Sequence, residues 1–147
     1  MYPHIGKSDT PAFVTISSSA ALAPIAGTAP YTAAKSASKA LTECFAFEHP
    51  EIYVGCVCPG FTKTNLFSRQ KEDISKNKLI SAFMSKRDRM VKKIVHGIKR
   101  KKYRMVYGAD AKLMEFLFKF FPKSFPRFFR GIMKISKQQM FEDIFIK

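Results

Sequence analysis

The sequence predicts an α/β fold: a partial parallel sheet of about three strands, with flanking helices and a helical C-terminal tail. Two short, continuously apolar stretches, residues 12–16 and 52–57, have the composition of strands buried on both faces. Between them, residues 31–47 are rich in Ala and free of Pro and Gly, as expected of a helix. Strand, helix and strand joined by short links form a βαβ unit, so the two strands should be parallel. Four apolar residues recur along one side of this helix: Ala34, Ala37, Leu41 and Phe45.

Further elements are expected in the second half of the chain. Residues 85–88 match a capping box, and apolar residues then recur at helical spacing. Residues 103–107 are a third strand candidate. Asp110 is placed to cap a helix over residues 111–121.

The charge of the chain is high and unevenly distributed. The 147 residues include 26 Lys and Arg against 11 Asp and Glu, a net charge of +15. With 46% hydrophobic and 25% charged residues, the composition is that of a globular protein and excludes a disordered chain. Most of the Lys and Arg residues, and most of the 15 Phe, lie from Lys71 onward. We therefore expect two parts, an α/β part over residues 1–110 and a basic, Phe-rich helical tail over residues 111–147.

The three cysteines are too few for a disulfide framework. We interpret Cys56 and Cys58 as buried, reduced thiols, because a lone C-x-C pair is a weak metal site. No stretch has the length and apolarity of a signal peptide or a membrane span. A cytoplasmic location is therefore expected.

A hydroxyl, a phenol and an ammonium are expected to meet at one edge of the sheet. Ser18 follows the first strand, and Tyr31 lies 13 positions later, at the start of the helix. Lys35 comes one helical turn after Tyr31, so both side chains share a face. The second strand ends in Pro59 and Gly60. Because parallel strands deliver their loops to the same edge, where open α/β sheets bind ligands, a site is predicted there.

These residues resemble the motifs of the short-chain dehydrogenase/reductase family. The Tyr-x-x-x-Lys motif, the Ser ahead of it and the Pro, Gly and Thr after the next strand are all present, as Tyr31, Lys35, Ser18, Pro59, Gly60 and Thr64. The resemblance is strong over residues 11–67 and fainter over residues 106–114. It implies a Rossmann-like sheet, of which residues 1–110 would form the C-terminal, catalytic part.

The resemblance implies interconversion of a carbonyl and a secondary alcohol with NAD or NADP, either of which fits these residues. Tyr31 would be the general acid/base, Lys35 would favour the ionised phenol and hold the nicotinamide ribose, and Ser18 would bond the substrate oxygen. The expected cofactor contacts are Tyr31, Lys35, Pro59, Gly60, Phe61, Thr62 and Thr64.

Family members also carry a strand, a Gly-rich turn and a helix that hold the cofactor pyrophosphate. The seven glycines here form no such cluster, since they stand at positions 6, 27, 55, 60, 97, 108 and 131. We therefore expect a truncated or split enzyme that lacks the dinucleotide-binding half and is inactive alone. Its first strand would have an unpaired edge, so we expect a homo-oligomer or a partner that supplies the missing half.

The tail over residues 112–137 alternates Lys and Arg with Phe. It is interpreted as a lid over a small, lipophilic carbonyl or alcohol substrate or a dimer contact, or as a peripheral contact with anionic membrane. Nucleic-acid binding is the third interpretation, although no recognition motif is present. Two classes of function follow: an NAD(P)-dependent oxidoreductase, and a non-enzymatic basic, amphipathic fragment that associates with an anionic membrane or a partner protein.

Overall fold

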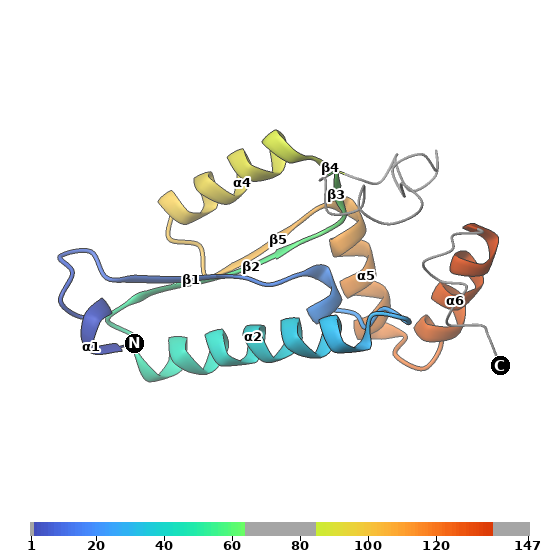
Figure 1. The fold of residues 1–147 in the computed structure, drawn as a ribbon, viewed down its shortest axis with the longest axis horizontal. Helices are drawn as coiled ribbons and strands as arrows, with labels where there is room; N and C mark the ends of the chain where they lie inside the picture. Colours follow the sequence, from blue (N-terminus) through green and yellow to red (C-terminus); the bar gives the residue numbers. More distant parts are fainter. Residues whose placement is uncertain (1, 64–84, 137–147) are drawn as a thin grey trace.

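Three parallel strands form the centre of the molecule (Figure 1). The computed structural model describes residues 2–63 and 85–136. Within these residues, β1 (Ala12–Ile16), β2 (Tyr53–Pro59) and β5 (Arg104–Tyr107) pair in the order β1-β2-β5. Both pairings are parallel. The α/β class with a three-stranded parallel sheet, expected from the sequence, is confirmed.

The middle strand carries the core of the sheet. Residues 54–58 of β2 are buried without alternation, as expected of a strand covered on both faces. In register, Val14 of β1 lies beside Gly55. Figure 1 shows α2 (Ala29–Glu48) on one face of the sheet and α4 (Arg87–Lys99) on the other.

The helix α2 contacts the sheet through hydroxyl groups. Thr42 is fully buried, and its Oγ1 lies 2.8 Å from Oγ1 of Thr15 and 2.7 Å from the carbonyl oxygen of Ser38. Near the end of the helix, the ring centroids of Phe13 and Phe45 are 5.0 Å apart. The apolar side expected from the spacing faces outward over most of its length, since three of its residues are exposed: Ala34, Ala37 and Leu41.

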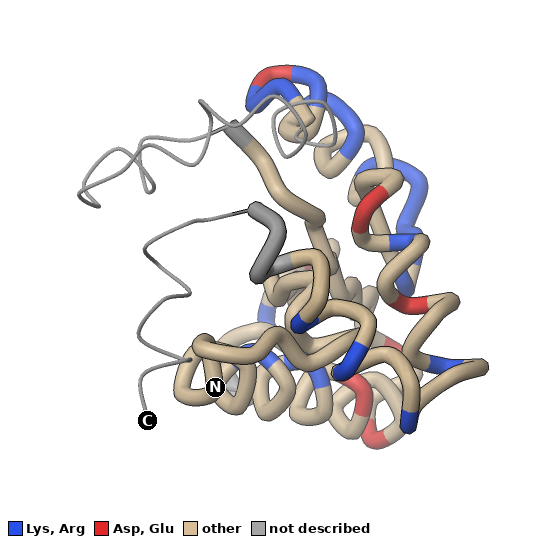
Figure 2. Tube along the Cα trace, turned by 90° about the vertical axis from the view of Figure 1, so that its right-hand side faces the viewer, with Lys and Arg blue, Asp and Glu red and all other residues tan. Residues whose placement is uncertain are grey.

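The helix α4 approaches the sheet closely. Its buried and half-buried residues recur at helical spacing, as Met90, Ile94, Gly97 and Ile98. A side chain at Gly97 would overlap the hydroxyl of Tyr107 and the sulfur of Met105. The glycine therefore permits the close approach. Lys and Arg are frequent along the outer side of α4 (Figure 2).

The capping box expected at residues 85–88 is not formed. Ser85 belongs to the short strand β4 (Ser85–Lys86), which pairs with β3 (Thr62–Lys63). The N-cap position of α4 is Lys86, which makes no side-chain cap bond. The expectation was wrong because strand pairing keeps Ser85 extended, one residue before the cap.

The C-terminal helices pack at the carboxyl ends of the strands. α5 (Ala109–Phe120) and α6 (Phe125–Ser136) follow β5, whereas the 3-10 helix η1 (Ser19–Ala21) follows β1 and the short α1 (Tyr2–Ile5) precedes it. An apolar cluster of buried residues joins η1 and the segment after it to α5 and α6: Ala20, Ala23, Ile25, Met114 and Phe125. The tail is thus packed onto the strand ends through its own apolar residues.

We predict that Gly97→Ala lowers the free energy of unfolding by about 1–3 kcal/mol, because the added methyl group overpacks the contact with Tyr107 and Met105. Gly131 is the matched control, since it also lies in a helix but a side chain there would meet nothing within 4 Å. Gly131→Ala should raise the free energy of unfolding by up to about 1 kcal/mol, because Ala has the higher helix propensity. Urea unfolding followed by circular dichroism measures both changes. Equal effects of the two substitutions would contradict close packing of α4.

Candidate active site

The segments that follow the three parallel strands meet at the carboxyl edge of the sheet. Residues 17–19 follow β1, residues 60–61 follow β2 and residues 108–110 follow β5. Four polar side chains are buried in these segments, which include the start of η1 and the first turn of α5: Ser17, Ser18, Ser19 and Asp110. Burial of polar groups costs free energy unless they are hydrogen-bonded, so such a concentration needs a specific arrangement of partners. This edge is the candidate active site.

Ser18 is held in a fixed orientation at the end of β1. Its backbone is extended, and it is the N-cap residue of η1. Its Oγ accepts a hydrogen bond from the Ala20 N–H at 3.2 Å. Because the oxygen serves as the acceptor, the hydroxyl proton can point away from the turn and donate to another oxygen.

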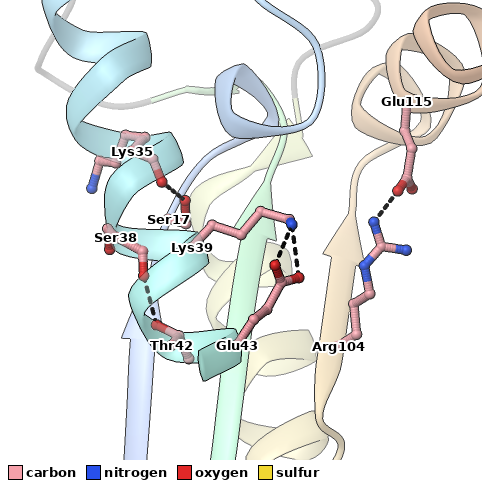
Figure 3. Close-up of polar contacts among 8 residues, drawn as sticks. All are labelled: Ser17, Lys35, Ser38, Lys39, Thr42, Glu43, Arg104 and Glu115. Carbon is pink, nitrogen blue, oxygen red and sulfur yellow. Dashed lines mark hydrogen bonds and ion pairs between the residues drawn. The ribbon is translucent and has the colours of Figure 1, made fainter. Parts of the chain in front are cut away.

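Lys35 forms two hydrogen bonds with residues at the end of β1. Its Nζ donates to the carbonyl of Ile16 at 3.0 Å. The Oγ of Ser17 donates to the backbone carbonyl of Lys35 at 2.8 Å (Figure 3). Since Ile16 and Ser17 directly precede Ser18, the structure brings Lys35 to the strand end that carries Ser18.

Tyr31 lies one turn before Lys35, in the first turn of α2. Its side chain is 47% exposed. The Nζ of Lys35 lies 5.9 Å from the centroid of the Tyr31 ring. The phenol and the ammonium therefore share a face, and the phenol can be reached from solvent.

The loop after β2 is held by hydrogen bonds on several sides. The Gly60 N–H donates to the carbonyl of Tyr107 at 2.7 Å. The Phe61 N–H donates to Oδ2 of Asp110 at 2.5 Å, and the Phe61 carbonyl accepts from the Ser85 N–H at 2.9 Å. Both backbone polar groups of Phe61 are thus bonded within the protein.

Two of the remaining expected cofactor contacts, Pro59 and Thr62, lie around the same loop. Pro59 is the last residue of β2 and pairs with Tyr107. The hydroxyl of Thr62 donates to the carbonyl of Gly60 at 3.1 Å. Thr64 lies outside the described residues.

Asp110 takes part in this edge in a way that the sequence did not indicate. Gly108, not Asp110, is the N-cap residue of α5, and Asp110 lies in the first turn of that helix. The expected cap was wrong because the Asp110 carboxylate bonds to Phe61 instead. Burial raises the pKa of the Asp110 carboxyl, against the lowering effect of hydrogen bonds from backbone N–H groups, that of Phe61 first. The one feature of the sequence that could have indicated this role is Gly-x-Asp, residues 108–110, directly after a strand.

Cys56 and Cys58 are buried in β2, as the sequence indicated. A hydrogen bond with Cys56, together with burial, raises the pKa of the Cys58 thiol. A thiol kept protonated in this way is a weak nucleophile and metal ligand. Across residues 2–63 and 85–136, no three metal-binding side chains come together.

Comparison with known proteins identifies the class of protein that this fold and edge define. The sequence model of the short chain dehydrogenase family matches residues 1–75, half of the chain. The chain therefore belongs to the short-chain dehydrogenase/reductase family, and the resemblance noted in the sequence is confirmed. No curated protein matches the chain.

A solved structure shows the same fold. It is a short-chain dehydrogenase from Sphingobium yanoikuyae in complex with NADPH, with a TM-score of 0.62 and 24% sequence identity. The match covers 93% of this chain and 50% of that one. The chain thus spans about half the length of the solved structure that it matches.

The raised pKa of Asp110 predicts a pH-dependent stability. The folded chain binds the proton of this carboxyl more tightly than the unfolded chain does. The free energy of unfolding should therefore fall as the pH rises above 3.8, the ordinary pKa of an Asp side chain. Asp110→Asn removes the titration. The unfolding free energy of the Asn variant, minus that of wild type, should therefore decrease as pH is lowered from 7 toward 4.

Urea unfolding across this pH range measures that difference. Asp88→Asn is the matched control, because Asp88 also lies in the first turn of a helix but is exposed. It should not reproduce the decrease. If the unfolding free energy of Asp110→Asn minus that of wild type does not change with pH, or increases as the pH is lowered, the assigned burial of the carboxyl is wrong.

Proposed function

We propose that this chain supplies the catalytic half of an NAD(P)-dependent oxidoreductase that interconverts a carbonyl and a secondary alcohol. The observation that carries the proposal is the attachment of Lys35 to Ile16 and Ser17, which joins the Tyr31–Lys35 turn to the strand end that bears Ser18. Family membership supports the reaction class. The NADPH in the similar Sphingobium yanoikuyae structure supports the cofactor class.

The proposed roles follow from the orientation of each group. Ser18 donates its hydroxyl proton to the substrate oxygen, since its Oγ already accepts from Ala20. Tyr31, exposed and near the ammonium, exchanges the proton of the alcohol as general acid/base. Lys35 supplies positive charge beside the phenol and a donor for a ribose hydroxyl. The nicotinamide, when bound, supplies or accepts the hydride.

The residues of this edge fit the nicotinamide end of such a cofactor. Hydroxyl and ammonium donors lie at the carboxyl ends of parallel strands, where open α/β sheets bind nucleotides. The proposed contacts are made by Tyr31 and Lys35, by residues 59–62 and by Thr64. Because the Phe61 backbone is bonded to Asp110 and Ser85, the contacts offered by this residue come from its ring.

The pyrophosphate end needs residues from elsewhere. A helix N-terminus with a Gly-rich turn provides most of the affinity for such a group, and the seven glycines of these 147 residues are dispersed. We propose that the dinucleotide-binding half is supplied by other residues, in the same polypeptide or in a partner. The 147 residues alone would then be inactive, and the outer edge of β1 is where a further strand would pair.

The tail is proposed to cover a lipophilic substrate. Met114 and Phe125 pack against Ala20, Ala23 and Ile25, which follow Ser18 closely in sequence. This contact crosses the boundary that we propose between residues 1–110 and 111–147. The two parts would therefore act as one unit, with the second closing the site formed by the first.

Fusion to the dinucleotide-binding half of the Sphingobium yanoikuyae enzyme tests the proposed function. The fusion should bind NADPH, measured by the change in nucleotide fluorescence, whereas residues 1–147 alone should not bind it measurably. Tyr31→Phe in the fusion should reduce turnover by at least about 100-fold, the contribution typical of general acid–base catalysis, with cofactor affinity nearly unchanged.

Tyr103→Phe is the matched control, since Tyr103 is also exposed but precedes β5 at the opposite end of the strand. It should leave turnover unchanged. A fusion that unfolds cooperatively yet binds no NADPH would contradict the proposed function. Full activity of the Tyr31→Phe fusion would remove Tyr31 from the mechanism.

A second candidate function is adsorption to an anionic membrane, as a cytoplasmic protein at the bilayer surface. It is favoured by exposed Phe residues that are interspersed with Lys and Arg in the sequence of the tail. The exposed apolar residues are Leu113, Phe116, Phe120, Phe121, Phe128 and Ile132. The basic residues of the same segment are Lys112, Lys119, Lys123, Arg127 and Arg130. Such a combination suits shallow binding to anionic lipid. Within the described ranges, no helix has the length and apolarity needed to cross a bilayer.

Sedimentation with vesicles that contain phosphatidylserine tests this second function. Replacing Phe120 and Phe128 together by Ser should weaken binding at least about tenfold, because two apolar rings no longer enter the lipid. High salt should also weaken binding. Phe47→Ser is the control, since Phe47 is 83% exposed but lies on α2. Equal binding to uncharged vesicles would contradict the electrostatic part of the proposal.

A further inference from the structure

Asp110 connects two segments that lie 49 residues apart. Its Oδ2 accepts the hydrogen bond from the Phe61 N–H at 2.5 Å. The side chain of Asp110 is 6% exposed, so this bond lies in the interior. It joins the first turn of α5 to the loop that leaves β2 at the candidate active site.

The backbone on both sides of the carboxylate is shaped to admit it. A side chain at Gly60 would overlap the Asp110 carboxylate, and so would a side chain at Gly108. Gly108 also has φ of 115°, a conformation that residues with a side chain rarely adopt. The Gly60 N–H bonds to Tyr107, which holds the two glycine-containing segments together. The carboxylate therefore occupies a space that two glycines leave open.

The position in the helix does not account for this arrangement. Asp88 occupies the same position in α4 and gains the same favourable interaction with a helix N-terminus. Its side chain is exposed and forms an ion pair with the neighbouring Arg87 at 3.5 Å. What distinguishes Asp110 is the bond to the Phe61 backbone.

Burial of the Asp110 carboxylate costs free energy, so a gain in stability does not by itself explain why it is buried. Oδ1 of Asp110 is buried without a hydrogen-bond partner among the described residues. An unpartnered buried polar atom costs free energy. In return, Phe61 is held on both sides, by Asp110 through its N–H and by Ser85 through its carbonyl. Its ring packs against the apolar cluster that contains Ala20.

We propose that Asp110 is a positioning residue for the candidate active site: its carboxylate fixes Phe61, and with it the loop of residues 59–62, at the carboxyl end of β2. Asp110 acts through Phe61 and does not itself touch the cofactor. The role of this loop in cofactor binding rests on the proposed function. The positioning of the loop does not rest on the proposed function, and it can be measured on the chain itself.

Amide hydrogen exchange of the 15N-labelled full chain tests the positioning. In Asp110→Ala, the Phe61 amide should exchange at least about tenfold faster than in wild type, because its acceptor is lost. Asp110→Asn should restore most of the protection, since the amide oxygen can still accept the bond. The Cys56 amide, bonded to the Tyr103 carbonyl at 2.7 Å, serves as the reference for global opening.

The matched controls are Asp88→Ala and Asp88→Asn, which should leave exchange at Phe61 unchanged. Equal acceleration at Phe61 and Cys56 in Asp110→Ala would show general destabilisation and overturn the proposal. Unchanged exchange at Phe61 would also overturn it. If the Ala variant does not fold, the Asn variant decides: the Phe61 amide proton should shift upfield, because an amide is a weaker acceptor than a carboxylate, while the Cys56 resonance stays in place.

The fusion described above separates this inference from the proposed function. Asp110→Ala in the fusion should raise the dissociation constant for NADPH at least about tenfold, and Asp110→Asn should recover most of the affinity. Faster exchange at Phe61 with unchanged NADPH affinity would overturn the role of Asp110 at the site. A wild-type fusion that binds no NADPH would contradict the proposed function, and the exchange measurement would still decide whether Asp110 holds the loop.

Discussion

The attachment of α2 to the end of β1 is the interaction on which the candidate site depends. Ser17 bonds to the backbone of Lys35, and the side chain of Lys35 bonds back to Ile16. Together with the buried contact between Thr42 and Thr15, these bonds fix both the rotation of the helix and its position along the strand. A helix attached only through apolar contacts could slide or rotate at smaller cost, because such contacts are not directional. Hydroxyl groups therefore contribute to setting the register of α2, and with it the position of the Tyr31–Lys35 turn.

The strands of the central sheet could be predicted from the sequence because they are buried on both faces. β1 has the predicted bounds, and the second strand is shifted by one residue at its start and extended by two at its end. A continuous apolar run between turn residues leaves little choice of structure at this length. The class of the fold follows from these two strands and the helix between them.

The packing side of α2 and the start of α4 could not be predicted in the same way. The spacing of Ala34, Ala37 and Leu41 indicated an apolar side, but these residues are exposed. Thr42 faces the sheet instead, because its hydroxyl contacts the hydroxyl of Thr15 in β1. Ser85 was expected to begin a helix, yet it pairs with Thr62, 23 positions earlier in the chain. Both errors arise from contacts with distant segments, which local periodicity does not contain.

The residues of the candidate site also differ in whether local sequence or contacts between distant segments determine their positions. Ser18, Tyr31 and Lys35 could be located from spacing within one βαβ unit. The contribution of Asp110 depends on a third strand returning beside the second, so that residues 61 and 110 meet. Its immediate surroundings suggested only a helix cap, the commonest role of Asp at such a position. Tertiary structure gave this carboxylate a different partner.

The space around the Asp110 carboxylate has a consequence for how the sequence can vary. Gly60, Gly108 and Asp110 occupy one small volume, although they come from two different segments, the loop after β2 and the start of α5. Enlarging either glycine requires a smaller or differently oriented side chain at position 110. Shortening that side chain opens a void that a larger residue at position 60 would fill. The three positions should therefore be inherited together, and redesign of this loop has to treat them as a single unit.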